Sequence, residues 1–205
     1  MRIVVILSAF TACVVVPSVA SAVEFWDYKF DRWSQEITDC DRLAAHGRDP
    51  GHVGPPVTRA EMDIDAAIDA CTSAVAKDPS NPRLNYQLGR AYGYAGRGEE
   101  AMRYRLVALK AEYPQSLFVI GYLHLLGVTI EQNTCQALRL WQKAARYRRL
   151  AALVALPRHY MRGDFAACGV EIPPAELQAY LVEAKTLTSD YYVGMLIEEL
   201  EAKVP

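Results

Sequence analysis

The sequence lacks an excess of charge of either sign. Its 22 Lys and Arg residues nearly balance its 24 Asp and Glu residues, which leaves a formal net charge of -2. Proteins that grip the phosphates of DNA or RNA need a strong basic excess or a basic stripe. We therefore expect no nucleic-acid partner.

The sequence also lacks the short motifs of common enzyme chemistry. None of its four His residues lies in an H-E-x-x-H pattern, and it has no glycine-rich phosphate loop, no G-x-S-x-G and no C-x-x-C. His46 and His52 flank Asp49 in a loop, but so loose a spacing favours solvated side chains over a metal site. The sequence predicts no enzyme, no cofactor and no metal.

What the chain does have begins with an export signal. Arg2 precedes an apolar stretch over residues 3–16, Pro17 breaks it, and Ala20-Ser21-Ala22 has the small-x-small form of a signal-peptidase site. We predict a signal peptide over residues 1–22 and a periplasmic or secreted protein, with no membrane span after cleavage. A short membrane anchor and a lipid attached to Cys13 are the alternatives.

Cleavage would leave four cysteines in an oxidising compartment, where disulfides form. Cys40 ends a run of apolar residues at steps of four and three from Trp26, which predicts one helix over residues 26–40. A Gly- and Pro-rich loop follows, and the capping-box pattern Thr58-x-x-Glu61 predicts the start of a helix that ends near Lys77. Cys71 lies on the apolar stripe of this second helix. The inward stripes favour the pairing of Cys40 with Cys71.

The next segment has the spacing of a helical repeat. Asp78-Pro79 stops one helix, and Leu88-Gly89, Tyr92, Ala101 and Ala108 then follow at offsets that resemble the tetratricopeptide pattern. Gly89 would let two helices approach closely, with Tyr92 between them. Gly96 and Gly98 would form the turn.

A related pattern follows. Ile120-Gly121-x-x-His124-x-x-Gly127, then Ala137 and Trp141, is similar to the Sel-one-like repeat, and its turn recurs as Leu156-x-x-x-Tyr160-x-x-Gly163. The two turn glycines are 36 residues apart, which is one repeat period. His124, Arg148 and Pro157 stand where the family has Tyr, Gly and Gly.

The resemblance implies an all-α fold, a right-handed solenoid of helical hairpins with disulfides. Its segments would be the signal peptide, an N-terminal helix and loop over 23–57, repeats over 58–187 and a capping helix over 188–205. Adjoining repeat turns would also bring Cys135 and Cys168 together.

The resemblance further implies a scaffold that binds a protein or peptide on its concave face. The outward positions of the first helices form an aromatic and basic stripe, which suits an acidic or carboxylate-bearing partner. The stripe contains Arg83, Tyr86, Arg90, Tyr94, Tyr122, Arg158 and Arg162, with Phe118 and Leu126 beside Tyr122.

Three alternatives stay open at this point. The stripe residues could pack against the neighbouring repeat or be solvated. The protein could associate with itself through its aromatic N-terminal segment. It could also be a cell-envelope hydrolase directed at β-lactams or peptidoglycan, as in cysteine-rich Sel-one-like proteins, although Cys135 and Cys168 lie 33 residues apart and not at a short spacing within each repeat.

Overall fold

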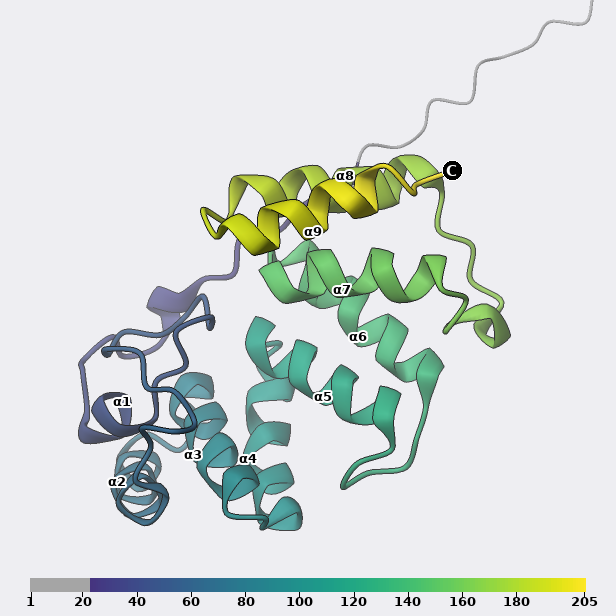
Figure 1. Cartoon of the computed structure of the whole chain (residues 1–205). Helices are drawn as coiled ribbons and strands as arrows, with labels where there is room; N and C mark the ends of the chain where they lie inside the picture. The colour runs from purple at the N-terminus through teal and green to yellow at the C-terminus, as the bar shows by residue number, and fades with distance from the viewer. Residues whose placement is uncertain (1–22) are drawn as a thin grey trace, which may run out of the picture.

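The computed structural model describes residues 23–205, so the predicted signal peptide lies outside the described residues. In this part the chain folds into α-helices and forms no β-strand (Figure 1). The helices are α1 (Asp39–Ala44), α2 (Ile64–Lys77), α3 (Pro82–Tyr94), α4 (Gly98–Lys110), α5 (Pro114–Leu126), α6 (Thr134–Arg146), α7 (Leu150–Met161), α8 (Pro174–Thr186) and α9 (Tyr191–Glu201). Short 3-10 turns span Phe30–Arg32 and Ala166–Cys168.

Consecutive helices pack as pairs, α3 with α4, α5 with α6 and α7 with α8, while α9 covers the end of the stack (Figure 1). Close approach explains the small residues inside the pairs. A Cβ at Gly89 would lie 2.9 Å from the Ala101 carbonyl oxygen, and one at Gly121 would lie 2.5 Å from the Trp141 ring. The predicted all-α stack of helical hairpins is confirmed.

The turns between the helices keep the repeat period. Gly127 and Gly163 follow α5 and α7 with φ of 68° and 82°, in the left-handed region that favours glycine. Glu112 and Arg148 are also 36 residues apart, and both have a φ of 55°. Arg148 therefore has the left-handed backbone conformation that glycine favours.

Within the described residues, disulfides join Cys40 to Cys71 and Cys135 to Cys168, as predicted, with Cα atoms 4.4 and 5.2 Å apart. The first bond ties α1 to α2 in the buried core, and the second ties the start of α6 to the 3-10 turn after α7. Each closes a loop of about thirty residues, for which chain entropy gives roughly 3 to 4 kcal/mol of stabilisation.

The predicted helix over residues 26–40 is wrong. Residues 23–38, which we call the strap, run without α-helix from the last helices to the first (Figure 1). Their aromatic side chains pack one by one on distant elements: Phe25 against Tyr180, Trp26 against Tyr147 and Tyr28 against Tyr113. Trp26 and Phe30, the first two rings of the apparent helical stripe, contact Tyr147 and Tyr113 instead of sharing a helix face.

The predicted start of α2 is also wrong. Thr58 does donate from its amide and hydroxyl to Glu61, but these bonds close a turn, and α2 begins at Ile64 with Asp63 as its N-cap. A complete capping box forms instead at Thr38 and Asp41, at the start of α1. The predicted helix over residues 26–40 hid this capping box, because it placed Thr38 inside a helix and not at a helix start.

Candidate functional site

The outward-facing residues of α3, α5 and α7 form one continuous surface, which we call the inner surface. The first helices begin 32 residues apart from α3 to α5 and 36 residues apart from α5 to α7. Equivalent positions are therefore occupied by Arg90, Tyr122 and Arg158, and by Tyr94, Leu126 and Arg162. Side chains also link the three helices directly, because Gln115 donates to the Tyr86 hydroxyl and Arg149 donates to the Gln115 amide oxygen. The inner surface thus runs across successive repeats.

The chain itself fills the half of the inner surface formed by α3. Arg83 is 3% exposed, and its guanidinium donates to the carbonyl oxygens of Ser34 at 2.8 Å and Glu36 at 3.1 Å. Arg90 is 4% exposed and donates to the carbonyl oxygens of Ala44, Ala45 and Val57. Residues 34–57 therefore lie on this half as an internal ligand.

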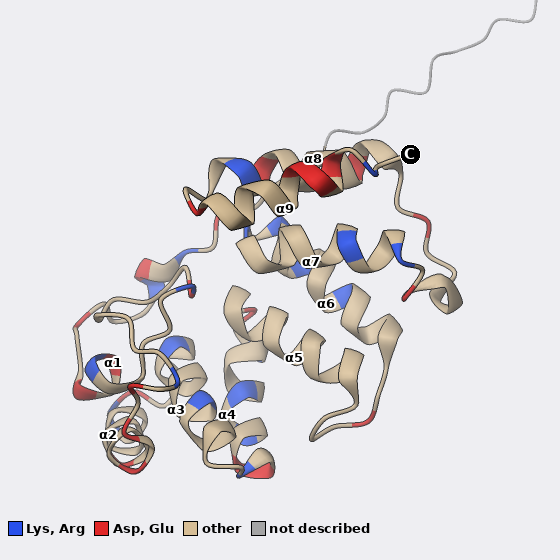
Figure 2. Ribbon diagram, viewed as in Figure 1, with Lys and Arg blue, Asp and Glu red and all other residues tan. Residues whose placement is uncertain are grey.

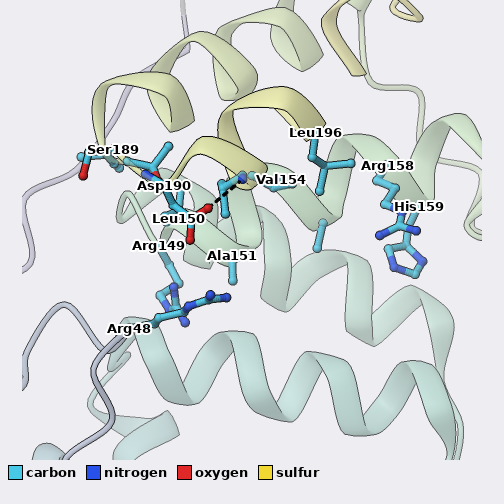
Figure 3. Close-up of a pocket in the computed structure, with 14 residues that line it drawn as sticks. Arg48, Arg149, Leu150, Ala151, Val154, Arg158, His159, Ser189, Asp190 and Leu196 are labelled. Carbon is cyan, nitrogen blue, oxygen red and sulfur yellow. Dashed lines mark hydrogen bonds between the residues drawn. The ribbon is translucent and has the colours of Figure 1, made fainter. Parts of the chain in front are cut away.

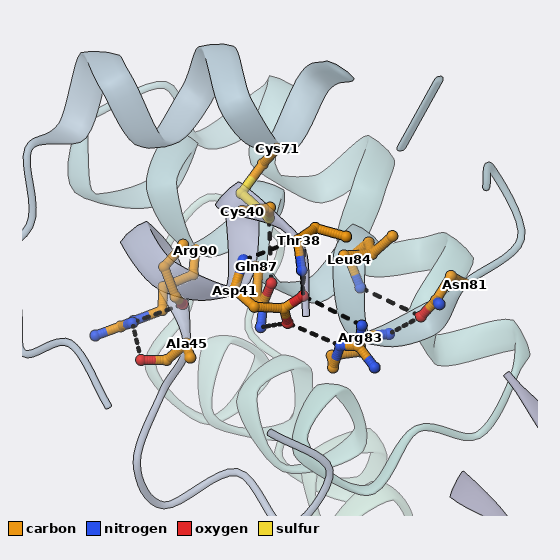
Figure 4. The surroundings of a disulfide bond; sticks show 11 residues. Thr38, Cys40, Asp41, Ala45, Cys71, Asn81, Arg83, Leu84, Gln87 and Arg90 are labelled. Carbon is orange, nitrogen blue, oxygen red and sulfur yellow. Dashed lines mark hydrogen bonds and ion pairs between the residues drawn. A yellow bond between two sulfur atoms is a disulfide. The ribbon is translucent and has the colours of Figure 1, made fainter. Parts of the chain in front are cut away.

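A buried carboxylate completes this contact. Asp41 is fully buried, and its Oδ1 lies 2.9 Å from Arg83 Nε and accepts a hydrogen bond from Gln87 (Figure 4). Asp41 is held in place by Thr38 and by the neighbouring Cys40–Cys71 disulfide. A buried ion pair requires close contact of this kind, because an unpaired charge in the interior is strongly unfavourable.

A second carboxylate from the same segment is buried beside α5. Both oxygens of Asp49 accept from the Tyr113 hydroxyl at 2.9 Å, and its Oδ1 accepts from the Gly51 amide. Burial raises the pKa of Asp49 to about 6, although these hydrogen bonds act in the opposite direction. Burial and the nearby arginines lower the pKa of His46 to about 4.

These contacts correct the expectation that the whole predicted stripe faces a partner. Arg83, Tyr86 and Arg90 are buried against the chain's own residues, and Tyr94 is half-buried with the guanidinium groups of Arg59 and Arg90 over its ring. Sequence spacing placed these residues on one helix face correctly. It carried no sign that residues 34–57 would return to cover that face.

The other half of the inner surface, formed by α5 and α7, is accessible. Tyr122 and Leu126 are 46% and 49% exposed, and Arg158 and Arg162 are also exposed. We call this set of four residues the open half. The structure thus divides the predicted stripe into a filled half and an open half.

A pocket of about 440 Å³ adjoins the open half (Figure 3). Its wall is α7, the start of α9 and the loop that carries Arg48, and most of this wall is apolar, from Leu150, Val154, Val193 and Leu196. Arg48 and Arg149 lie at one end, and Arg158 and His159 at the other. No local sequence pattern marks this pocket, because its wall joins segments about a hundred residues apart in the chain, roughly the length of a small domain.

The structure brings together no serine-histidine pair in this pocket. His159 Nδ1 lies 2.6 Å from Asp164, but Ser189 is at the opposite end of the pocket (Figure 3). His52 Nδ1 lies 2.6 Å from the Asp49 backbone oxygen, and no group of His, Cys, Asp or Glu within residues 23–205 has the arrangement of a metal site. No helix in this part of the chain is long and apolar enough to cross a membrane.

Comparison with solved structures finds proteins of similar fold. The crystal structure of a Sel1 repeat protein from Oxalobacter formigenes is similar with a TM-score of 0.49 and 16% sequence identity, over 69% of this chain and 99% of that chain. No protein-family model and no curated protein matches the sequence. The helix-pair stack is established by the chain's own helices and their packing, and no function follows from this likeness.

Proposed function

We propose that this protein is an exported interaction scaffold whose open half binds an extended segment of another protein. The observation that carries the proposal is the filled half, where Arg83 and Arg90 hold an irregular segment of the same chain mainly by its backbone carbonyl groups. Every polypeptide has such carbonyl groups. The same kind of contact at the equivalent positions of α5 and α7 would therefore suit a segment from a partner.

The chemistry of the open half favours an acidic or carboxylate-bearing segment. Lys and Arg residues occur on α3 and α7, whereas Asp and Glu residues gather on α8 and α9 (Figure 2). Arg158 and Arg162 offer guanidinium groups, and Tyr122 offers aromatic area that contributes to binding when it is buried. The ion pair of Asp41 with Arg83 is an example of such a carboxylate–guanidinium contact within the chain itself.

Export is part of the proposal. Disulfides persist mainly in oxidising compartments, and the described residues contain two, one of them buried in the core. Together with the composition of residues 1–22, they support a periplasmic or secreted protein. The exported form would begin at Val23.

A capture experiment tests the function. Residues 23–205 serve as bait for exported proteins, beside a double variant Tyr122→Ala/Arg158→Ala and a control Arg139→Ala, whose exposed side chain lies on α6. We expect the double variant to lose affinity by about tenfold or more, as anchor residues do. A partner that binds the double variant as well as the parent would contradict the proposal.

A further inference from the structure

The pocket beside the open half contains a buried guanidinium with no acidic partner. Arg149 is 3% exposed, and its Nε donates to Gln115, while its two terminal nitrogens donate no hydrogen bond to any residue of 23–205. Its head group also lies over the Phe118 ring at 5.3 Å. A charge so deeply buried normally has a paired anion or, as at Arg90, several carbonyl acceptors, because the loss of water around it is otherwise not offset.

A second guanidinium from another part of the chain lies at the same end of the pocket. Arg48 is exposed, and Figure 3 places its head group next to that of Arg149. The charges of both arginines act together on His46, whose pKa they help to lower. No carboxylate lies within 4.0 Å of either guanidinium in the described residues.

Two acidic residues lie near this end, Asp49 and the pocket-lining Asp190, and neither pairs with the two arginines. Asp49 accepts from Tyr113 and Gly51, and Asp190 uses its Oδ1 to cap α9 by accepting from the amides of Tyr192 and Val193. The two arginines thus leave a positive end in a pocket whose remaining wall is largely apolar. A volume of about 440 Å³ suits a small ligand rather than a folded partner.

From these observations we propose that the pocket binds a small carboxylic acid with an apolar body. The carboxylate lies between Arg48 and Arg149, where two guanidinium forks provide several donors to its oxygens. The apolar body lies along Leu150, Val154 and Leu196, where it is removed from water. This site goes beyond the proposed function, because its ligand is a small molecule and its occupancy does not require a protein partner.

Calorimetric titration of residues 23–205 tests the site with a matched ligand series. The probes are octanoate, 1-octanol, octylammonium, inorganic phosphate and a short peptide that ends in leucine with a free carboxylate. We expect octanoate to bind about tenfold or more tightly than 1-octanol, because only the acid pairs with the arginines. Octylammonium should not bind detectably.

Two variants and a control locate the binding. Arg48→Gln changes an exposed loop residue and should keep the fold intact, whereas Arg149→Gln removes the buried charge. Each variant should weaken the binding of octanoate about tenfold. Arg139→Gln, away from the pocket on α6, should leave it unchanged. Equal binding of octanoate and 1-octanol, or no effect of Arg48→Gln, would overturn the site.

The other two probes distinguish a small free acid from an inorganic anion and from the carboxylate at a chain end. Phosphate that binds as tightly as octanoate would contradict a requirement for an apolar body. Tighter binding of the leucine-ended peptide than of octanoate would likewise contradict a small free acid and assign the pocket to a chain end. These outcomes are independent of the capture experiment, which depends on Tyr122 and a protein partner.

Discussion

At the scale of single residues, the side chains that matter most are those whose environment is satisfied only in the folded chain. Asp41 and Asp49 are buried carboxylates. Asp41 pairs with Arg83 of α3, and Asp49 accepts from Tyr113, the residue before α5. The sequence shows such residues as ordinary polar positions in a loop. Only the fold reveals that they occupy the inner surface that was predicted to bind a partner.

Variants of Arg148 measure the strain of a left-handed backbone conformation at a residue other than glycine. The Arg148 side chain pairs with Asp27 at 2.6 Å and Glu183 at 2.8 Å, while its φ of 55° suits glycine. Arg148→Gly and Arg148→Ala both remove these ion pairs, but only glycine relaxes the backbone. We expect the Gly variant to exceed the Ala variant by about 1 kcal/mol in free energy of unfolding in urea. Equal stability would show that this position carries no strain.

His46 and Asp49 give a pH dependence of opposite sign. The pKa of His46 is lowered to about 4, so its contribution to stability is complete above its ordinary pKa of 6.5 and is lost as the pH falls through 4. The pKa of Asp49 is raised to about 6, so its contribution is complete below its ordinary pKa of 3.8 and is lost as the pH rises through 6. Between pH 4 and 6 the two contributions oppose each other.

Single variants should uncover each contribution. Relative to the parent, His46→Gln should gain stability as the pH falls from 6 towards 4, and Asp49→Asn should lose it. Urea unfolding at the two ends of this window measures the difference. A change of the same sign in both variants would contradict the assignment.

At the scale of helices, local spacing predicted the repeats well and the N-terminal segment poorly. Gly89, Gly121, Gly127 and Gly163 mark close approaches and turns that depend on neighbouring residues in the chain, so their pattern is visible in the sequence. The rings of the strap have partners as distant as Tyr180. No local period encodes such contacts, and tertiary packing overrode the apparent helix.

Alanine variants at two glycines distinguish the effect of close packing from that of helix propensity. Gly194 lies inside α9 with no atom within 4 Å of a Cβ built there, so Gly194→Ala should stabilise the protein by about 0.5 to 1 kcal/mol. Gly89→Ala brings its Cβ against the Ala101 carbonyl and should destabilise by at least about 1 kcal/mol. Thermal unfolding of both variants measures the contrast, and stabilisation at Gly89 would show that α3 and α4 can separate freely.

At the scale of the whole molecule, the strap and the Cys40–Cys71 disulfide determine which surface is available. The strap crosses the stack from Phe25 at α8 to Ser34 and Glu36 at α3, and residues 39–57 continue over the inner face of α3. The filled half is therefore built into the fold. In our proposal, the open half and its pocket are the surfaces that bind other molecules.

Hydrogen exchange of residues 23–205, alone and with a captured partner, tests this division most directly. We predict that the partner slows amide exchange over residues 118–126 and 151–162, which carry the open half, because bound segments restrict local opening. Exchange in α3 should stay as slow as in the free protein, since residues 34–57 already cover it. Faster exchange over residues 34–57 with the partner present, or protection confined to α2 and α4, would contradict the account.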